Sequence, residues 1–208
     1  MCNRVRWLHT VSVDPREERS ARLLRETLFD LASVRDIATI TATELSAATG
    51  LARRTIYNHG AGPQELLFGY LAEELTEIRE WGIRNFSERA SVEAFEEGLE
   101  RLLDHVQRHR AIYERAVSAT TSPAWHHMLT QHFTVSLLVF VETFPPASGI
   151  ARDEDSKQVI ASSLAHGMVG AIEAWLRLPG DPGTELCHRL IMALIPPWFI
   201  GQATETPA

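Results

Sequence analysis

The stretch that decides the fold is residues 41–67, "TATELSAATGLARRTIYNHGAGPQELL". Thr41 and Glu44 have the spacing of a capping box, which predicts a helix that starts near Ala42. Gly50 follows six residues after Glu44, so this helix is short, and the next one must end by Gly60. Two short helices joined by a glycine turn are typical of a helix-turn-helix.

A longer apolar helix precedes this pair. Asp14 and Pro15 form a good helix start, with the carboxylate as cap and the proline at the first helical position. Apolar side chains then recur at helical spacing, at Ala21, Leu24, Leu28 and Leu31. We therefore expect a three-helix head over residues 14–62, with an irregular connection at 33–40 and a flexible extension at 1–13.

The rest of the chain, residues 63–208, is expected to be a larger helical body. Apolar spacing and proline or glycine punctuation predict helices at 63–87, 92–108, 110–119, 124–143, 154–178 and 183–199. The predicted fold is all-α, with about nine helices in total.

The charge of the chain is divided unevenly. The 208 residues carry a formal charge of -7, yet residues 1–60 hold nine arginines against seven acidic residues. Such a head can approach a polyanion, while the acidic body does not. No apolar run is long enough for a transmembrane helix and no signal peptide is evident, so we expect a cytoplasmic protein. Cys2 and Cys187 suggest neither a disulfide framework nor a metal site.

The residue types in the second short helix suit a DNA groove. Arg53 and Arg54 can place forked donors on guanine or on phosphate. Thr55, Tyr57 and His59 are suited to phosphate oxygens, whose contacts fix the register of a protein on DNA. A small core of Leu45, Leu51 and Ile56 is expected to join the two helices.

The quoted stretch, with its Ala-x-x-Gly-Leu-x-x-x-Thr-Ile-Tyr-x-His core, resembles the DNA-binding signature of the TetR family of bacterial transcription regulators. The resemblance covers roughly residues 16–70 and implies a ligand-responsive regulator, most often a repressor that a small molecule releases from its operator. It also implies DNA contacts by Thr41, Thr43, Ala52, Arg53, Arg54, Thr55, Tyr57, Asn58 and His59.

This head departs from the family pattern at two positions. A bulky apolar residue usually follows the histidine, and a lysine that meets phosphate usually opens the next helix; here these positions hold Gly60 and Pro63. We expect weaker packing between the head and the fourth helix, and one charge contact fewer. A TetR-like protein whose head has lost DNA binding is therefore an alternative.

A regulator that binds a two-fold DNA site must itself be a two-fold dimer. The last two helices carry the candidate interface, which combines small residues with an apolar partner face: Ser163, Gly167, Gly170 and Ala174, with Leu186, Leu190 and Leu194. The alternative is that these side chains pack inside one subunit.

An effector pocket is expected in the body, because small-molecule sites combine apolar walls with a few polar groups. The candidate lining residues are Trp81, Trp125, Met128, His132, His166 and Trp175. A stripe of tryptophan, methionine and phenylalanine at helical spacing is, however, more often plain core than a pocket.

The rival hypothesis is a helical-bundle metalloprotein or enzyme that uses its histidines. His105 and His109 share a helix face, and His126, His127 and His132 cluster in the sequence, but no His-Glu-x-x-His motif and no His-Cys grouping supports a metal site. No nucleophile–base pair or phosphate loop is evident. We therefore predict no enzymatic activity, no cofactor and no metal.

Overall fold

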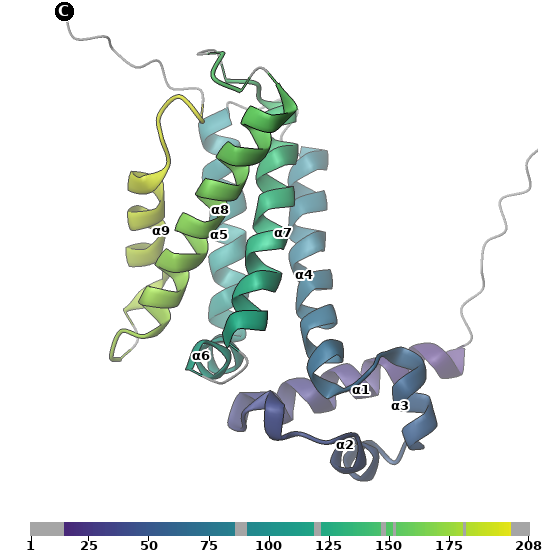
Figure 1. The fold of residues 1–208 in the computed structure, drawn as a ribbon. Helices are drawn as coiled ribbons and strands as arrows, with labels where there is room; N and C mark the ends of the chain where they lie inside the picture. Colours follow the sequence, from purple (N-terminus) through teal and green to yellow (C-terminus); the bar gives the residue numbers. More distant parts are fainter. Residues whose placement is uncertain are drawn as a thin grey trace, which may run out of the picture.

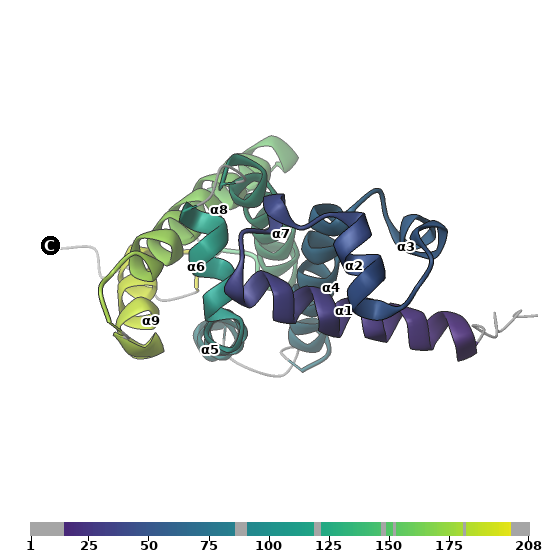
Figure 2. The ribbon, with the colours of Figure 1, turned by 90° about the horizontal axis from the view of Figure 1, so that it is seen from below.

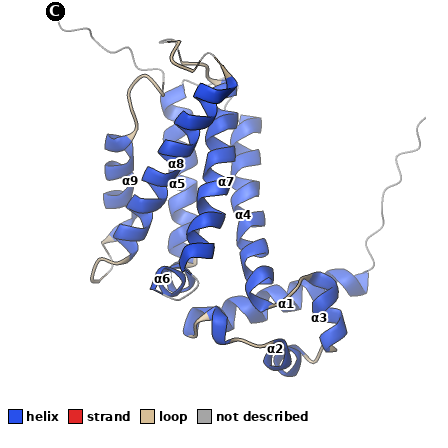
Figure 3. Ribbon diagram, in the orientation of Figure 1, coloured by secondary structure: helices blue, strands red, loops and turns tan. Residues whose placement is uncertain are grey.

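The computed structural model describes residues 15–85, 91–118, 122–146, 149–151, 153–180 and 182–200. Across these residues the structure is entirely helical, with nine α-helices and one short 3-10 helix (Figure 3). The predicted fold class is confirmed. The elements are α1 (Pro15–Val34), η1 (Ile37–Thr39), α2 (Ala42–Thr49), α3 (Arg53–His59), α4 (Pro63–Asn85), α5 (Ser91–Arg108), α6 (Arg110–Ser118), α7 (Ser122–Thr143), α8 (Glu154–Leu176) and α9 (Gly183–Leu194).

The head lies at one end of the body, and α4 passes from one into the other (Figure 1). The core of the head is formed by side chains of three helices. Leu24 and Leu28 of α1, Leu45 of α2 and Ile56 of α3 are all fully buried. Leu51 is partly buried against this core. The small apolar core that was expected between α2 and α3 is therefore present.

Local sequence signals account for the boundaries of α2. The Thr41 hydroxyl accepts a hydrogen bond from the Glu44 amide at 3.2 Å, and the Glu44 carboxylate accepts one from the Thr41 amide at 2.9 Å. Gly50 ends the helix with φ at 70°, a left-handed conformation that favours glycine. The capping box and the glycine turn are confirmed, whereas the extension 1–13 and the Asp14 cap lie outside the described residues.

The body stacks α7 between α8 and α4, and α5 between α4 and α9. Its core includes the largest fully buried side chains, among them Tyr113 of α6 and Trp125 of α7. Seen from below, α6 lies near the C-terminal end of α1, whose N-terminal end projects beyond α4 (Figure 2). The Arg115 guanidinium of α6 donates to the Ser33 carbonyl of α1 at 2.9 Å, so the body contacts the head directly.

The last helix is shorter than predicted. We expected it to reach residue 199, but α9 ends at Leu194 because Pro196 disfavours a helical conformation at the preceding Ile195, which is extended with ψ at 124°. The chain beyond it still packs into the body, where the ring of Phe199 lies 5.4 Å from that of Phe140 and is fully buried. Likewise α8 ends at Leu176, two residues before its expected end.

Among the described residues, one helix, α8, is long and apolar enough to cross a membrane by length and composition. It packs along α7 and α9 and buries one face, which includes Met168, Ile172 and Trp175. Core helices of soluble proteins have the same length and composition, and these contacts place α8 in the body of a helical bundle.

Candidate nucleic-acid interface

Helix α3 presents a polar, basic face to solvent and anchors itself by one side chain. Ile56 is fully buried, while Arg53, Arg54 and Asn58 are exposed and Tyr57 retains 56% of its accessible surface. Thr55 and His59 are half-buried at the flanks. The burial of Ile56 therefore fixes which side of α3 faces outward, and the two arginines lie on that side.

The predicted DNA-contacting residues of α2 lie beside those of α3. Arg53 donates a long hydrogen bond of 3.4 Å to the Thr43 hydroxyl, which joins the two helices at their exposed edges. Ala52, at the N-cap of α3, is exposed, and Thr41 is exposed while its hydroxyl serves the capping box. The structure thus brings Thr43 and Arg53 together and leaves Thr41 and Ala52 exposed at the N-caps of α2 and α3.

Arg35 is a supporting residue that the sequence analysis missed. Its guanidinium lies 3.1 Å from the Glu44 carboxylate and donates to the Thr39 carbonyl at 3.2 Å. It therefore ties η1 to the first turn of α2. Hydrogen bonds to Arg35 and Thr41 lower the pKa of Glu44, with the Thr41 amide as the largest cause.

The turn between α2 and α3 is held by hydroxyl groups. Ser46 donates to the Leu51 carbonyl at 2.6 Å, and the Thr49 hydroxyl accepts from the Leu51 amide at 3.3 Å. These bonds satisfy backbone groups that leave the helices at the turn. The start of α3 is consequently fixed relative to α2.

Gly60 follows α3 because the side chain of Leu66 occupies the adjacent space. A Cβ atom at residue 60 would lie 2.8 Å from Cδ2 and 3.0 Å from Cγ of Leu66, which is itself buried. The backbone at Gly60 is extended, with φ at 176°, so conformation alone would admit any residue. The packing expected to be lost at this position is supplied by α4 instead.

We expect Gly60→Ala to lower the free energy of unfolding by about 1–2 kcal/mol, because Leu66 must shift to relieve an overpacked contact. Gly62→Ala is the matched control, since a Cβ there meets nothing within 4 Å. Urea denaturation of both variants measures the difference. Equal stabilities would mean that Leu66 moves aside without cost.

The start of α4 has Pro63 where the family pattern has a lysine, and an acidic side chain, Glu65, follows two residues later. Pro63 is the first residue of the helix, and the Glu65 carboxylate accepts a hydrogen bond from the Ala61 amide at 3.2 Å. A carboxylate at this point stabilises the N-terminal end of the helix. It also makes this end less attractive to phosphate than a lysine would.

The body contains a largely apolar cavity of about 130 Å³. Helices α4, α5 and α7 form most of its wall, and its polar side chains include Arg79, His132 and Ser136. The apolar wall includes Ile78, Phe95, Leu99, Phe133, Phe140 and Met168. Burial, reinforced by the nearby charge of Arg79, lowers the pKa of His132 to about 4. At neutral pH the imidazole is therefore uncharged.

The structure brings only one of the six predicted effector-binding residues to the lining of this cavity, His132. Trp125 is fully buried and its ring lies 4.7 Å from that of Tyr113. Trp175 is buried and donates to the Gly183 carbonyl. Trp81 lies under the Arg101 guanidinium, Met128 is partly buried against the core, and His166 is exposed. Arg79 was not among the predicted lining residues, because a single charged residue in a sequence does not indicate that its side chain faces a cavity.

The half-buried His132 in the wall of the cavity predicts an acid-sensitive body. The unfolded chain takes up this proton near pH 6.5 and the folded chain near pH 4, so the unfolded state binds more protons between these values. The free energy of unfolding should fall by up to about 3 kcal/mol as the pH is lowered through this window. Denaturation of wild type and His132→Asn at several pH values measures it, with the exposed His127→Asn as control. If the free energy of unfolding changed with pH in the same way for wild type and His132→Asn, His132 would not be the group responsible for the acid sensitivity.

The predicted dimer residues lie on exposed faces of α8 and α9. Ser163, Gly167, Gly170 and Ala174 are all exposed along one side of α8. Leu190 and Leu194 of α9 retain 52% and 60% of their accessible surface, and Leu186 is half-buried. In the single subunit, then, all of them except Leu186 are exposed to solvent.

The histidines form two groups with carboxylates that sequence spacing did not reveal. His126 lies 3.0 Å from the Glu173 carboxylate. His105 and His109 both approach Glu74 of α4, at 3.2 and 2.8 Å. Burial alone would raise the pKa of Glu74, but the two imidazoles outweigh it and hold the pKa well below its ordinary range. Glu74 was missed because it is 31 residues from His105.

Comparisons with known proteins agree with this architecture. Residues 93–179 match a TetR-type family model described as "Transcriptional regulator C-terminal region". No curated protein matches the chain. Two solved structures are similar: a dihydroxyacetone kinase operon activator, DhaS, and a TetR-family transcriptional regulator from Streptomyces coelicolor.

The first similarity has a TM-score of 0.60 at 14% identity and covers 84% of this chain and 93% of that one. The second has a TM-score of 0.56 at 19% identity and covers 85% of this chain and 78% of that one. At such identities the similarity establishes the fold, which is the layout of a helix-turn-helix head on a helical body. The family match covers residues 93–179 of the body, and the two solved structures share the fold over most of the chain, so the comparisons agree on a TetR-type architecture.

Proposed function

We propose that this protein is a homodimeric repressor that binds a two-fold DNA operator and is released by a small-molecule effector. The observation that carries the proposal is the orientation of α3. Ile56 is fully buried, and Arg53 and Arg54 therefore face solvent, as a recognition helix requires. Residues 14–62 would act as the DNA-binding unit and residues 63–208 as the effector and dimer unit. Such a protein works on DNA in the cytoplasm and is not an enzyme.

Base contacts are assigned to Arg53 and Arg54, which have forked donors suited to guanine. Thr41, Thr43, Ala52, Thr55, Tyr57, Asn58 and His59 would hold phosphates or the edge of the groove, because they surround α3 on the same head. Phosphate contacts position the protein, whereas base contacts select the sequence.

The exposed faces of α8 and α9 are the proposed dimer interface. Small side chains such as Gly167 and Gly170 allow a partner helix to approach closely, and nothing lies within 4 Å of a Cβ placed at either position. Leu190 and Leu194 supply apolar surface that a single chain leaves in water. Burial of such surface is a main source of association free energy.

The cavity between α4, α5 and α7 is the proposed effector site. Its wall is mostly apolar, with Arg79 and the neutral His132 as its principal polar groups. It suits a small apolar molecule with one polar end. The effector must bind two states of the dimer with different affinity, since otherwise it cannot shift the equilibrium between them.

A route from the cavity to the head follows α4. Leu75, Ile78 and Arg79 of α4 line the cavity, and Leu66 of the same helix packs beside Gly60 at the end of α3. A shift of α4 caused by the effector would therefore move α3. In a dimer, this changes the separation of the two heads and their fit to successive major grooves.

A gel-shift assay with DNA from upstream of the protein's own coding region tests the proposal. We expect a saturable shift at low salt that weakens as salt is raised, because phosphate contacts release counterions. A reporter fused to the same DNA reads the sign of regulation, since one similar structure belongs to an activator. No shift with any genomic fragment at low salt would instead support the alternative of a head that has lost DNA binding.

A further inference from the structure

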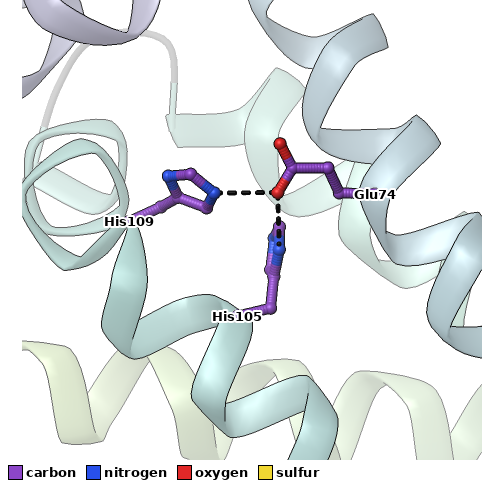
Figure 4. Close-up of side chains that lie close together, drawn as sticks. All are labelled: Glu74, His105 and His109. Atoms are coloured by element: carbon purple, nitrogen blue, oxygen red, sulfur yellow. Dashed lines mark hydrogen bonds and ion pairs between the residues drawn. The ribbon is translucent and has the colours of Figure 1, made fainter.

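Three side chains converge in a small cluster (Figure 4). Glu74 comes from α4, His105 from the last turn of α5, and His109 is the residue between α5 and α6. The His109 amide still donates to the His105 carbonyl at 3.2 Å, so the helical turn continues as far as His109. One Nδ1 or Nε2 atom of each histidine and one carboxylate oxygen of Glu74 all lie within 4.8 Å of one another. This is the only such group of three among the residues that the structure describes.

The nitrogen of His105 that faces this group is buried and poorly satisfied. The residue is fully buried, and its Nδ1 lies 3.2 Å from Glu74 Oε2 without the alignment of a hydrogen bond. Its other nitrogen, Nε2, lies 2.8 Å from the Tyr113 hydroxyl. Tyr113 therefore fixes the ring so that Nδ1 points toward Glu74 and His109.

We propose that Glu74, His105 and His109 form a binding site for a divalent transition-metal ion such as Zn²⁺. Two imidazole nitrogens and one carboxylate oxygen are ordinary ligands of this ion, and the histidines have the i, i+4 spacing that places both on one helix face. The site revises the expectation from sequence that the chain binds no metal.

The geometry requires only small side-chain rotations. A tetrahedral zinc ion with bonds of about 2.0–2.1 Å holds its ligand atoms roughly 3.3 Å apart. The contacts of Glu74 Oε2 with His105 and His109 are 3.2 and 2.8 Å, close to that separation. The two histidine rings, whose centroids are 5.0 Å apart, must turn toward each other, and water or another ligand completes the tetrahedron.

Two arginines face the same carboxylate and oppose the ion. Arg25 of α1 lies 3.8 Å from Glu74 Oε1 and Arg108 of α5 lies 3.9 Å from Oε2. Each guanidinium has an alternative to its contact with Glu74. Arg25 also forms an ion pair with Glu73, and the side chain of Arg108 is 64% exposed and can be solvated by water. The ion therefore displaces Arg108 toward solvent and weakens one of the two contacts of Arg25.

The position of the site connects it to the head. Phe29 of α1 packs its ring 4.9 Å from that of His109, and Arg25 belongs to the same helix. An ion that reorients His109 and Glu74 therefore acts on α1, which carries part of the head core. The binding itself is independent of the proposed DNA-binding function and can be measured without DNA.

The test is direct metal titration of the untagged, full-length protein. Co²⁺ is added while the visible absorption of tetrahedral Co²⁺ is recorded, and Zn²⁺ affinity is measured by competition with a chelating dye. We expect one ion per chain. His109→Ala and Glu74→Gln should each bind Zn²⁺ at least about a hundredfold more weakly, because even loss of an outer-shell partner costs 10–100-fold.

His126→Ala is the matched control, because it also removes a histidine from a contact with a carboxylate but lies outside the site. It should bind metal as the wild type does. Tyr113→Phe should bind about 10–100-fold more weakly, since it removes the hydroxyl that orients His105 and no metal ligand. Circular dichroism confirms that each variant is folded.

Either of two results would overturn the proposal. One is the absence of stoichiometric binding to the folded wild type. The other is equal affinity of wild type, His109→Ala and Glu74→Gln. Loss of DNA binding with metal binding intact would instead refute the proposed function and leave the metal site standing.

Discussion

Replacement of Arg53 and Arg54 together by alanine is expected to remove specific operator binding. Both side chains are exposed at the start of α3, and each bidentate contact to guanine contributes about 1–3 kcal/mol of discrimination. The pair would then contribute roughly 2–6 kcal/mol if the two contacts are additive. Equilibrium binding to the operator and to an unrelated duplex at one fixed salt concentration measures the loss.

A control separates base contacts from general charge. Arg19→Ala with Arg22→Ala removes the same charge from the exposed part of α1 and should leave the preference for the operator unchanged. If Arg53 and Arg54 contact only phosphate, their loss weakens binding equally on both duplexes. It then also reduces the salt slope by about 0.9 for each contact. That outcome would move sequence selection away from these two arginines.

Conversion of Leu190 and Leu194 to glutamate is expected to split the proposed dimer. Both leucines are more than half exposed on α9, so the change costs little in the isolated subunit. In an apolar interface, however, the carboxylates would lose water without a partner. Light scattering should report a monomer in place of a dimer. Operator affinity should fall at least about a hundredfold, because one head contacts only half of a two-fold site.

Val135→Glu is the matched control for this pair. Val135 of α7 is 47% exposed and lies outside the two faces proposed for the dimer. It should remain dimeric and bind the operator normally. A Leu190→Glu, Leu194→Glu protein that remains dimeric while staying helical would place the interface on another surface.

Much of the head could be predicted because its signals are local. The capping box joins residues three apart, and the glycine turn at residue 50 depends on the conformation of a single residue. The outward position of Arg53 and Arg54 follows from helix geometry once Ile56 is assigned to the core. These features depend on neighbours in the chain, which are visible in the sequence.

The body was predicted only in outline, because its sites depend on how helices pack. Trp125 and Trp175 have residue types suited to a pocket, yet the packing of α7 and α8 places them in the core. Arg79 lines the cavity together with His132, although arginine is mostly found on protein surfaces. Helix periodicity gives the buried face of each helix but not the neighbour that it meets.

The sequence by itself determined the fold class, namely helices throughout, a glycine turn and a short basic helix ahead of an acidic body. Only the tertiary structure placed Leu66 beside Gly60 and Glu74 beside His105 and His109. The physical reason is distance along the chain. Hydrogen bonds within a helix or turn join residues a few positions apart, whereas these contacts depend on the angle and register between separate helices.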